Sequence, residues 1–349
     1  MRGKWGMLVF GAAAALLTGC TNMVPGSPAP EPAARAPVTI DDYGLDLTLR
    51  ERGDLQTAAV LRTIDPCGFF SHAQLSKYGQ VAQVAPYLTP ESCQVRIHSG
   101  DTRAESIEVQ LSARKPDSAA DHPVDGGSVL RAKEPVADEE CELIVPMKLP
   151  AAGVGDPGGS TFTEYAQVTA ESFSGDNCAP AGAVASRILG AVRDLKVPLR
   201  RYAVTVLPGG DFDPCALLGR MPAGWTVARL TSVANPYDCT FYARKDQVDQ
   251  YIAVRLEVGK ADAPASTRQA SIDLGGRPAT SYCPGTSSPE VPETCFIDFA
   301  LDGVYDGNIA NSPLRTSEQA YGKVRTTVSV YGAKTVVQEL ALAAAAIYR

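Results

Sequence analysis

The sequence lacks the patterns that mark the common enzyme classes. Its 349 residues contain three histidines, His72, His98 and His122, and none of the motifs H-E-x-x-H, G-x-x-x-x-G-K-[ST] or G-x-S-x-G. A zinc protease, a nucleotide-driven machine and a serine hydrolase therefore have no supporting signature. We expect a protein that is not an enzyme and that has no cofactor and no metal site. A hydrolase of unrecognised type is kept as a third hypothesis.

Positive charge and long apolar runs are also scarce. There are 32 Lys and Arg against 39 Asp and Glu, a formal net charge of −7, and no basic block. Capture of nucleic acid phosphates is therefore not expected. One apolar run approaches membrane length, at the N-terminus, which excludes a polytopic membrane protein. The length and the apolar content of 45% fit a globular chain of about two domains.

The first twenty residues have the form of an export signal. Arg2 and Lys4 precede a twelve-residue apolar run, GMLVFGAAAALL, which is too short for a permanent transmembrane helix. The run ends in LTGC, which resembles the bacterial lipobox, where a peptidase cuts before a lipid-modified cysteine. We predict a signal peptide over residues 1–19 and lipidation, including palmitate, on Cys20. The mature protein would be a lipoprotein on the extracytoplasmic face of the cell membrane.

Residues 20–40 are rich in proline and alanine, with prolines at positions 25, 28, 30, 32 and 37. Such a composition favours extended polyproline conformations and cannot form a core. We predict a semi-rigid tether that lifts the folded part off the bilayer.

Eight further cysteines predict disulfides, because an exported protein meets an oxidising environment. They lack the C-x-x-C spacing of zinc or redox sites. The eight are Cys67, Cys93, Cys141, Cys178, Cys215, Cys239, Cys283 and Cys295.

An internal repeat gives these cysteines a register. Landmarks of the first half recur 146 to 154 residues later: Asp65-Pro66-Cys67 as Asp213-Pro214-Cys215, Cys93 as Cys239, Gly126-Gly127 as Gly275-Gly276, and Cys141 as Cys295. We therefore predict two tandem homologous domains, residues 41–198 and 199–349. The register suggests the pairs Cys67–Cys93, Cys215–Cys239, Cys141–Cys178 and Cys283–Cys295.

Each half has strand patterns between helical ones, which predicts an α+β fold of antiparallel sheets flanked by helices. Expected helices cover residues 55–64, 71–79 with an S-x-x-Q capping box, 179–195 and 333–348. Expected strands cover residues 94–98, 106–113, 128–132, 142–148 and 162–170, then 226–230, 239–243, 251–258, 279–282, 295–301 and 325–331. Residues 196–210 join the halves and include a strand-like run at 202–206.

Three further motifs have structural interpretations. The aspartate before each Pro-Cys is expected to cap the following helix. The G-x-G-x-x-G match at residues 153–158 contains Pro157 and is expected to be a hairpin loop rather than a nucleotide site. The acidic run Asp138-Glu139-Glu140 is expected to be a solvated loop.

Together, the lipobox, the tether, the Asp-Pro-Cys helix start and the later cysteine before an Ala-rich helix resemble actinobacterial exported lipoproteins of unknown function. That family is similar to the extracellular sensor domains of actinobacterial serine/threonine kinases. The resemblance implies an antiparallel sheet flanked by helices, two disulfides per domain and a cleft for an envelope ligand. The second half departs from the pattern, because Lys334 stands near the place of the helix-start cysteine.

The leading hypothesis is a non-enzymatic, lipid-anchored envelope protein that binds a small molecule, a lipid or a wall-derived ligand. The alternative is a structural or protein-interaction module of the envelope. In either case the membrane is contacted through the lipid on Cys20.

Overall fold

The computed structural model describes most of the chain from Asp42 onward. The described residues are 42–98, 105–113, 119–132, 140–147, 149, 164–173, 176–203, 205–232, 235–262, 269–284, 293–307 and 322–348. The expected signal peptide, Cys20, the tether, the G-x-G-x-x-G segment, Asp138 and Glu139 lie outside them. No helix within the described ranges is long and apolar enough to cross a membrane.

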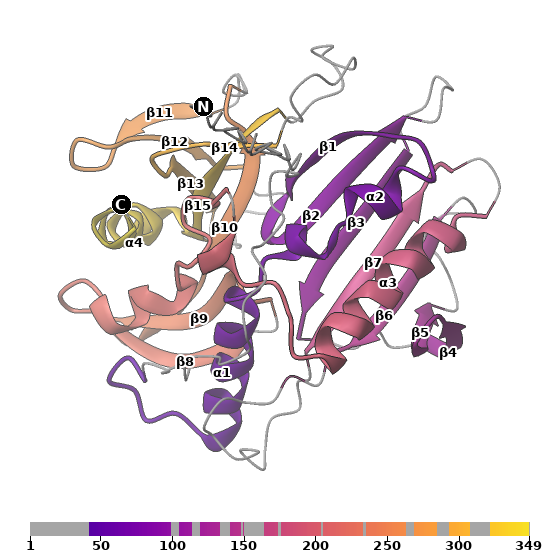
Figure 1. The fold of residues 1–349 in the computed structure, drawn as a ribbon. Helices are drawn as coiled ribbons and strands as arrows, with labels where there is room; N and C mark the ends of the chain where they lie inside the picture. Colours follow the sequence, from indigo (N-terminus) through magenta and orange to yellow (C-terminus); the bar gives the residue numbers. More distant parts are fainter. Residues whose placement is uncertain are drawn as a thin grey trace, which may run out of the picture.

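The first sheet has seven antiparallel strands in the order β1-β2-β3-β7-β6-β5-β4 (Figure 1). Its strands are β1 (Gln80–Tyr87), β2 (Thr89–His98), β3 (Glu105–Ser112), β4 (Ala119–Val124), β5 (Gly127–Ala132), β6 (Glu140–Pro146) and β7 (Tyr165–Glu171). Strict alternation produces the two faces of β3: Ile107, Val109 and Leu111 are buried, whereas the residues between them are partly exposed.

The second sheet has eight strands, seven of which follow the order β11-β12-β13-β15-β10-β9-β8. Its strands are β8 (Thr226–Ser232), β9 (Asp238–Lys245), β10 (Val248–Lys260), β11 (Ala270–Asp273), β12 (Pro278–Tyr282), β13 (Thr294–Ala300) and β15 (Lys323–Ala333). The short β14 (Tyr305–Asp306) pairs with β15 outside this path.

The two sheets have the same strand order and the same central register. In the first sheet, pairing runs from Cys93 to Val109, Val168 and Leu143. In the second sheet, the equivalent row is Cys239, Val254, Val330 and Ile297. A one-residue slip would turn every side chain of a strand to the other face, so the shared register gives both sheets the same buried face.

One closing helix covers each buried face. Helix α3 (Cys178–Arg193) packs on β6 and β7, and α4 (Lys334–Ile347) packs on β13 and β15. Both helices are rich in alanine on their packed side, which lets the helix axis approach the sheet. Val184 and Ile188 of α3, and Leu340 and Ala344 of α4, are buried in the two cores.

Helix α1 (Leu49–Arg62) belongs to both domains. Thr48 and Glu51 form a capping box at its start. Its residue Leu55 lies in the core of the second domain together with the preceding Tyr43 and Leu47. Its last turn, with Leu61, lies in the core of the first domain. The segment before the first domain thus completes the core of the second.

Each Asp-Pro-Cys motif opens a short 3-10 helix, η1 (Pro66–Phe69) or η3 (Pro214–Arg220). The backbone N–H of Cys67 donates to Asp65 Oδ1 at 3.0 Å, and that of Cys215 donates to Asp213 Oδ1 at 3.1 Å. The predicted aspartate caps are therefore confirmed, on 3-10 helices rather than α-helices.

The prediction of disulfides is confirmed. The bonded pairs are Cys67–Cys93, Cys141–Cys178, Cys215–Cys239 and Cys283–Cys295, as the repeat register suggested. Two of them hold η1 and η3 to the second strand of their sheets. Cys141–Cys178 fastens α3 to β6, whereas Cys283–Cys295 connects the end of β12 to β13.

At the level of class, the chain is mostly β, with two antiparallel-sheet domains and few helices. The capping box at Ser71 was wrong: α2 (His72–Leu75) has no side-chain cap and ends before residue 79. The strand expected at 202–206 was also wrong. Here η2 (Arg200–Tyr202) forms instead, because the linker bonds to the end of α1, with Arg200 N–H donating to the Thr63 carbonyl at 2.9 Å.

Candidate functional site

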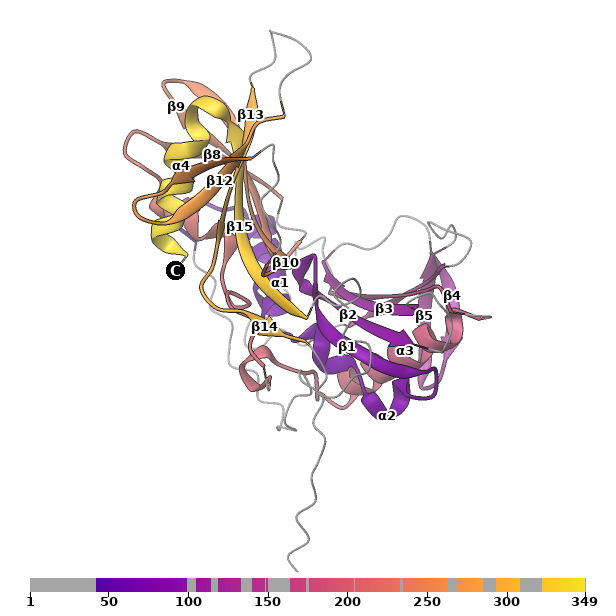
Figure 2. The ribbon, with the colours of Figure 1, turned by 90° about the horizontal axis from the view of Figure 1, so that it is seen from above.

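Each sheet has a face opposite its closing helix, which we call its open face. In Figure 2, α4 lies on the side of the second sheet turned away from the first domain. The open face of the second sheet therefore looks toward the first domain's side of the molecule. Its side chains are the ones that alternate with the buried core residues.

Five aromatic side chains cross the open face of the second sheet. One stands on each of β9, β10, β15, β13 and β12, and we call the set the aromatic row: Tyr242, Tyr251, Tyr331, Phe296 and Tyr282. Tyr242 is paired directly with Tyr251. Phe296 is paired with Tyr331 on one side and with Tyr282 on the other. Direct partners share a face, and Tyr331 is paired with Ala253, two residues from Tyr251 on the same face of β10, so all five side chains lie on the open face.

Four of the five rings contact one another along the row. Ring centroids are 5.7 Å apart between Tyr242 and Tyr251, 6.0 Å between Tyr251 and Tyr331, and 4.7 Å between Tyr331 and Phe296. These separations are within the range of attractive aromatic pairs. The Arg229 guanidinium of β8 lies 4.3 Å from the Tyr242 ring centroid and closes this end of the row. The contacts fix the orientation of the rings.

The row remains accessible to solvent. Tyr251 is 39% exposed, and the other four side chains are partly exposed. None belongs to the buried core of the second domain. A contiguous aromatic patch left in water does not contribute its full area to folding, and such patches mark interaction sites.

Charged side chains form a parallel row beside the rings. Arg255 lies opposite Asp238, with an Nε–Oδ2 distance of 2.9 Å. Across Ser329, the row continues to Asp298. Partial burial raises the pKa of Asp298 against the opposing effect of the Ser329 hydroxyl, and burial and Asp298 raise the pKa of Glu257. The rings therefore border a strip that contains the Arg255–Asp238 ion pair and the carboxyl group of Asp298.

The Cys283–Cys295 disulfide lies directly behind one end of the aromatic row. Cys283 follows Tyr282, and Cys295 precedes Phe296, so the bond joins the two strands that carry these rings. The first domain places its corresponding bond elsewhere, between β6 and α3. The departure of the second half from the repeat thus coincides with the aromatic row.

The first sheet has no such row at the equivalent positions. The shared register matches Tyr242, Tyr251, Tyr331 and Phe296 to Arg96, Ser106, Thr169 and Glu142. Glu108 occupies the place of Ala253. Burial, Glu171, Glu91 and Glu140 raise the pKa of Glu108 to about 7, although the Ser92 hydroxyl lowers it. The open face of the first sheet is polar and acidic.

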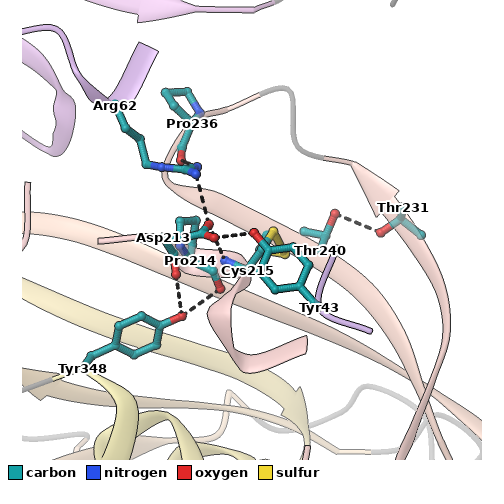
Figure 3. The surroundings of a disulfide bond; sticks show 10 residues. Tyr43, Arg62, Asp213, Pro214, Cys215, Thr231, Pro236, Thr240 and Tyr348 are labelled. Atoms are coloured by element: carbon teal, nitrogen blue, oxygen red, sulfur yellow. Dashed lines mark hydrogen bonds and ion pairs between the residues drawn. A yellow bond between two sulfur atoms is a disulfide. The ribbon is translucent and has the colours of Figure 1, made fainter. Parts of the chain in front are cut away.

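Asp213 of the second Asp-Pro-Cys motif connects three distant parts of the chain (Figure 3). Its carboxylate lies 3.2 Å from Arg62 Nη2 and accepts a hydrogen bond from the Tyr43 hydroxyl. The Tyr348 hydroxyl lies 2.9 Å from the carbonyl oxygens of both Asp213 and Pro214. The motif therefore anchors α1 and the C-terminal end of the described chain.

Arg200 plays a similar part at the first motif. Its side chain donates to the carbonyl oxygens of Arg62, at 3.1 Å, and of Pro90. Burial raises the pKa of Asp65 to about 6 and that of Glu91 to about 7, while the charge of Arg200 opposes both shifts. A small apolar cluster of Ala85, Leu207, Val258, Tyr305 and Val324 lies between the domains. These buried contacts fix the domains together.

The other residues singled out from the sequence are not brought into one site. His72 lies on α2, His98 ends β2 and His122 lies on β4. Among the residues that the structure describes, no three His, Cys, Asp or Glu side chains form a group suited to a metal ion. One sequence signal pointed to the aromatic row, the alternation in β10, but the rings on the other strands align only through the register.

Comparisons with known proteins add no relative: no family model, no curated protein and no solved structure matches this chain.

Proposed function

We propose that this protein is a lipid-anchored, extracytoplasmic envelope protein that binds a ligand without transforming it. The lipobox-like end of the signal supports lipidation of Cys20. The four disulfides support an oxidising compartment. Membership of the actinobacterial lipoprotein family that the motifs resemble is part of this proposal.

We also propose that the two α+β domains arose by tandem duplication. The identical strand order and the shared register of four central strands support this origin. Equivalent Asp-Pro-Cys motifs with equivalent disulfides add to it. Duplication leaves one copy free to diverge, and the open faces are where the copies differ.

The binding surface is the open face of the second domain. The observation that carries this assignment is the aromatic row, which combines apolar area with ring orientations set before any ligand arrives. Tyrosine and phenylalanine provide large contact areas at a small cost in conformational entropy. The surface stands on strands of a stapled sheet, so it is rigid.

The test is mass spectrometry of the full chain purified from its native envelope. Wild type and a Tyr331→Ala variant are compared for molecules released by organic solvent and by denaturation. We expect a stoichiometric ligand on the wild type and its loss from the variant. Ligand content that is equal in both would contradict the assignment of the surface.

A protein partner is the other occupant that the same face suits, because tyrosines are enriched in protein interfaces. Chemical cross-linking in native membranes separates the two cases. A reproducible partner that depends on Tyr331, without a small ligand, would make the protein an interaction module.

The anchor has its own test. Cys20→Ala is expected to abolish incorporation of a labelled fatty acid in growing cells. A variant that is still labelled would show that Cys20 is not the lipidated residue.

A further inference from the structure

The chemistry of the aromatic row identifies the class of ligand, and this inference rests on the proposed function. We propose that the open face of the second domain binds an extended, uncharged glycan of the envelope, with successive sugar rings seated along the row.

The row is extended rather than cage-like, with one diagonal step between Tyr251 and Tyr331. It crosses five adjacent strands, from Tyr242 on β9 to Tyr282 on β12. Neighbouring strands lie about 4.8 Å apart, so the four intervals span roughly 19 Å. An extended oligomer of ring-shaped units matches this length and direction, whereas a single small molecule would cover one or two rings.

Aromatic rings and sugar rings are complementary in charge as well as shape. The C–H groups on one face of a pyranose are weakly positive and poorly hydrated, and they suit the negative face of an aromatic ring. The hydroxyl groups at the rim of the sugar need acceptors. Asp298 lies on the strip beside the row, two residues from Phe296, and supplies carboxylate oxygens, which are strong acceptors.

The local charge selects against acidic polymers. Arg255 is paired with Asp238 at 2.9 Å and Arg244 with Asp249 at 2.6 Å, Arg229 lies against the Tyr242 ring, and Asp298 adds negative charge beside Phe296. A polymer with phosphates or uronic acids would meet repulsion from these carboxylates, which is a source of specificity. An uncharged glycan avoids this repulsion.

The disulfide behind the row completes the site. Cys283–Cys295 holds β12 to β13, and these strands present Tyr282 and Phe296. A rigid platform reduces the entropy that is lost on binding. The Cys283–Cys295 disulfide therefore positions the rings of Tyr282 and Phe296, which explains why it differs in place from the corresponding bond of the first domain.

The experiment measures binding of the full chain, in detergent, to delipidated and protease-digested envelope polymer from the producing cells. The polymer is used intact, after periodate oxidation of its sugar diols, and as size-fractionated fragments. We expect saturable binding that periodate abolishes and that strengthens with fragment length until the fragment spans the row. Soluble polygalacturonate, an acidic glycan, should not compete.

Three variants tie the binding to the row. Tyr331→Ala is expected to weaken binding roughly tenfold or more, as for the central residue of an interface. Tyr331→Phe keeps the ring and should retain binding. Tyr165→Ala, which removes a partly exposed tyrosine from the open face of the first sheet, should leave binding unchanged. Equal thermal unfolding of the variants excludes loss of fold.

No binding to the polymer, binding that survives periodate, or equal binding by Tyr331→Ala would overturn the glycan assignment. If mass spectrometry of the native protein still finds another ligand lost from Tyr331→Ala, the proposed function stands and the ligand class alone is wrong. If neither ligand nor polymer depends on Tyr331, both proposals fail.

Discussion

The two sheets share a strand order, a register and a pair of Asp-Pro-Cys staples, yet their open faces differ in chemistry. The second presents tyrosines and a phenylalanine where the first presents Arg96, Ser106, Thr169 and Glu142. The buried faces stay alike because both must pack a core against an Ala-rich helix. The frame is therefore constrained by packing, whereas the open face is free to vary.

The junction provides the largest expected effect. Arg200→Met should lower the free energy of unfolding by about 3–5 kcal/mol, because it removes the buried hydrogen bonds to the Arg62 and Pro90 carbonyls and the positive charge near the buried Asp65 and Glu91. Urea denaturation at pH 8 measures the loss. Arg244→Met, on the exposed Asp249 pair, is the control and should change little. If Arg200→Met lowered the free energy of unfolding as little as Arg244→Met does, the contacts of Arg200 between the domains would contribute no more than the exposed ion pair.

The two domains also differ in the position of one disulfide, Cys141–Cys178 in the first and Cys283–Cys295 in the second. Replacing both cysteines by serine should cost about 4 kcal/mol for Cys141–Cys178 and about 3 kcal/mol for Cys283–Cys295, because the first closes the longer loop in the unfolded chain. The sequence separations are 37 and 12 residues. Thermal and urea unfolding give the difference. Polymer binding should fall for the second variant only, and a fall for both would remove the positioning role from Cys283–Cys295.

The two copies of the capping aspartate should respond in opposite directions at pH 8. Asp213→Asn removes the charge paired with Arg62 and should cost roughly 1.5 kcal/mol. Asp65→Asn keeps the cap on Cys67 and removes a carboxylate whose pKa burial raises to about 6, so it should stabilise the fold. Urea midpoints of both variants measure the effects. Destabilisation by Asp65→Asn would mean that the negative charge of Asp65 stabilises the folded state.

The pH-dependent difference between the two sheets concerns Glu108, where the second sheet has Ala253. Its pKa is raised from 4.5 to about 7, so the folded state holds a proton that the unfolded state releases. Wild-type stability should therefore rise as the pH falls below about 7, with the gain complete below about 4.5. Glu108→Gln should be more stable than wild type at pH 8 and equal to it near pH 4.5. Urea unfolding of both proteins at the two pH values measures this. If the difference in stability between wild type and Glu108→Gln were the same at both pH values, Glu108 would not cause the pH dependence.

Much of the frame was predictable from sequence because it depends on local signals. The repeat located the cysteine pairs, and both aspartates cap their helices as expected. Alternating patterns found the central strands, while β1, β4, β11 and β14 at the margins were missed because their patterns are weak. The run at 202–206 reads as a strand, but its neighbour Arg200 bonds to Thr63 instead.

The aromatic row was not predictable in the same way. Its members lie between Tyr242 and Tyr331 in the sequence and meet only because five strands pair in one particular register. A sequence shows which residues of a strand alternate, but not which residues lie opposite one another across non-consecutive strands. The pairing of β13 with β15, and of β15 with β10, is a long-range property.

The path of the chain through the second domain determines how the protein carries mechanical load. Tyr43 and Leu47, at the start of the described chain, and Tyr348, near its end, are all buried in the core of the second domain. Tension applied between the two ends is therefore borne first by that domain, through the contacts of Asp213 and Pro214. The first domain, inserted between these points, is shielded from the pull until the second gives way.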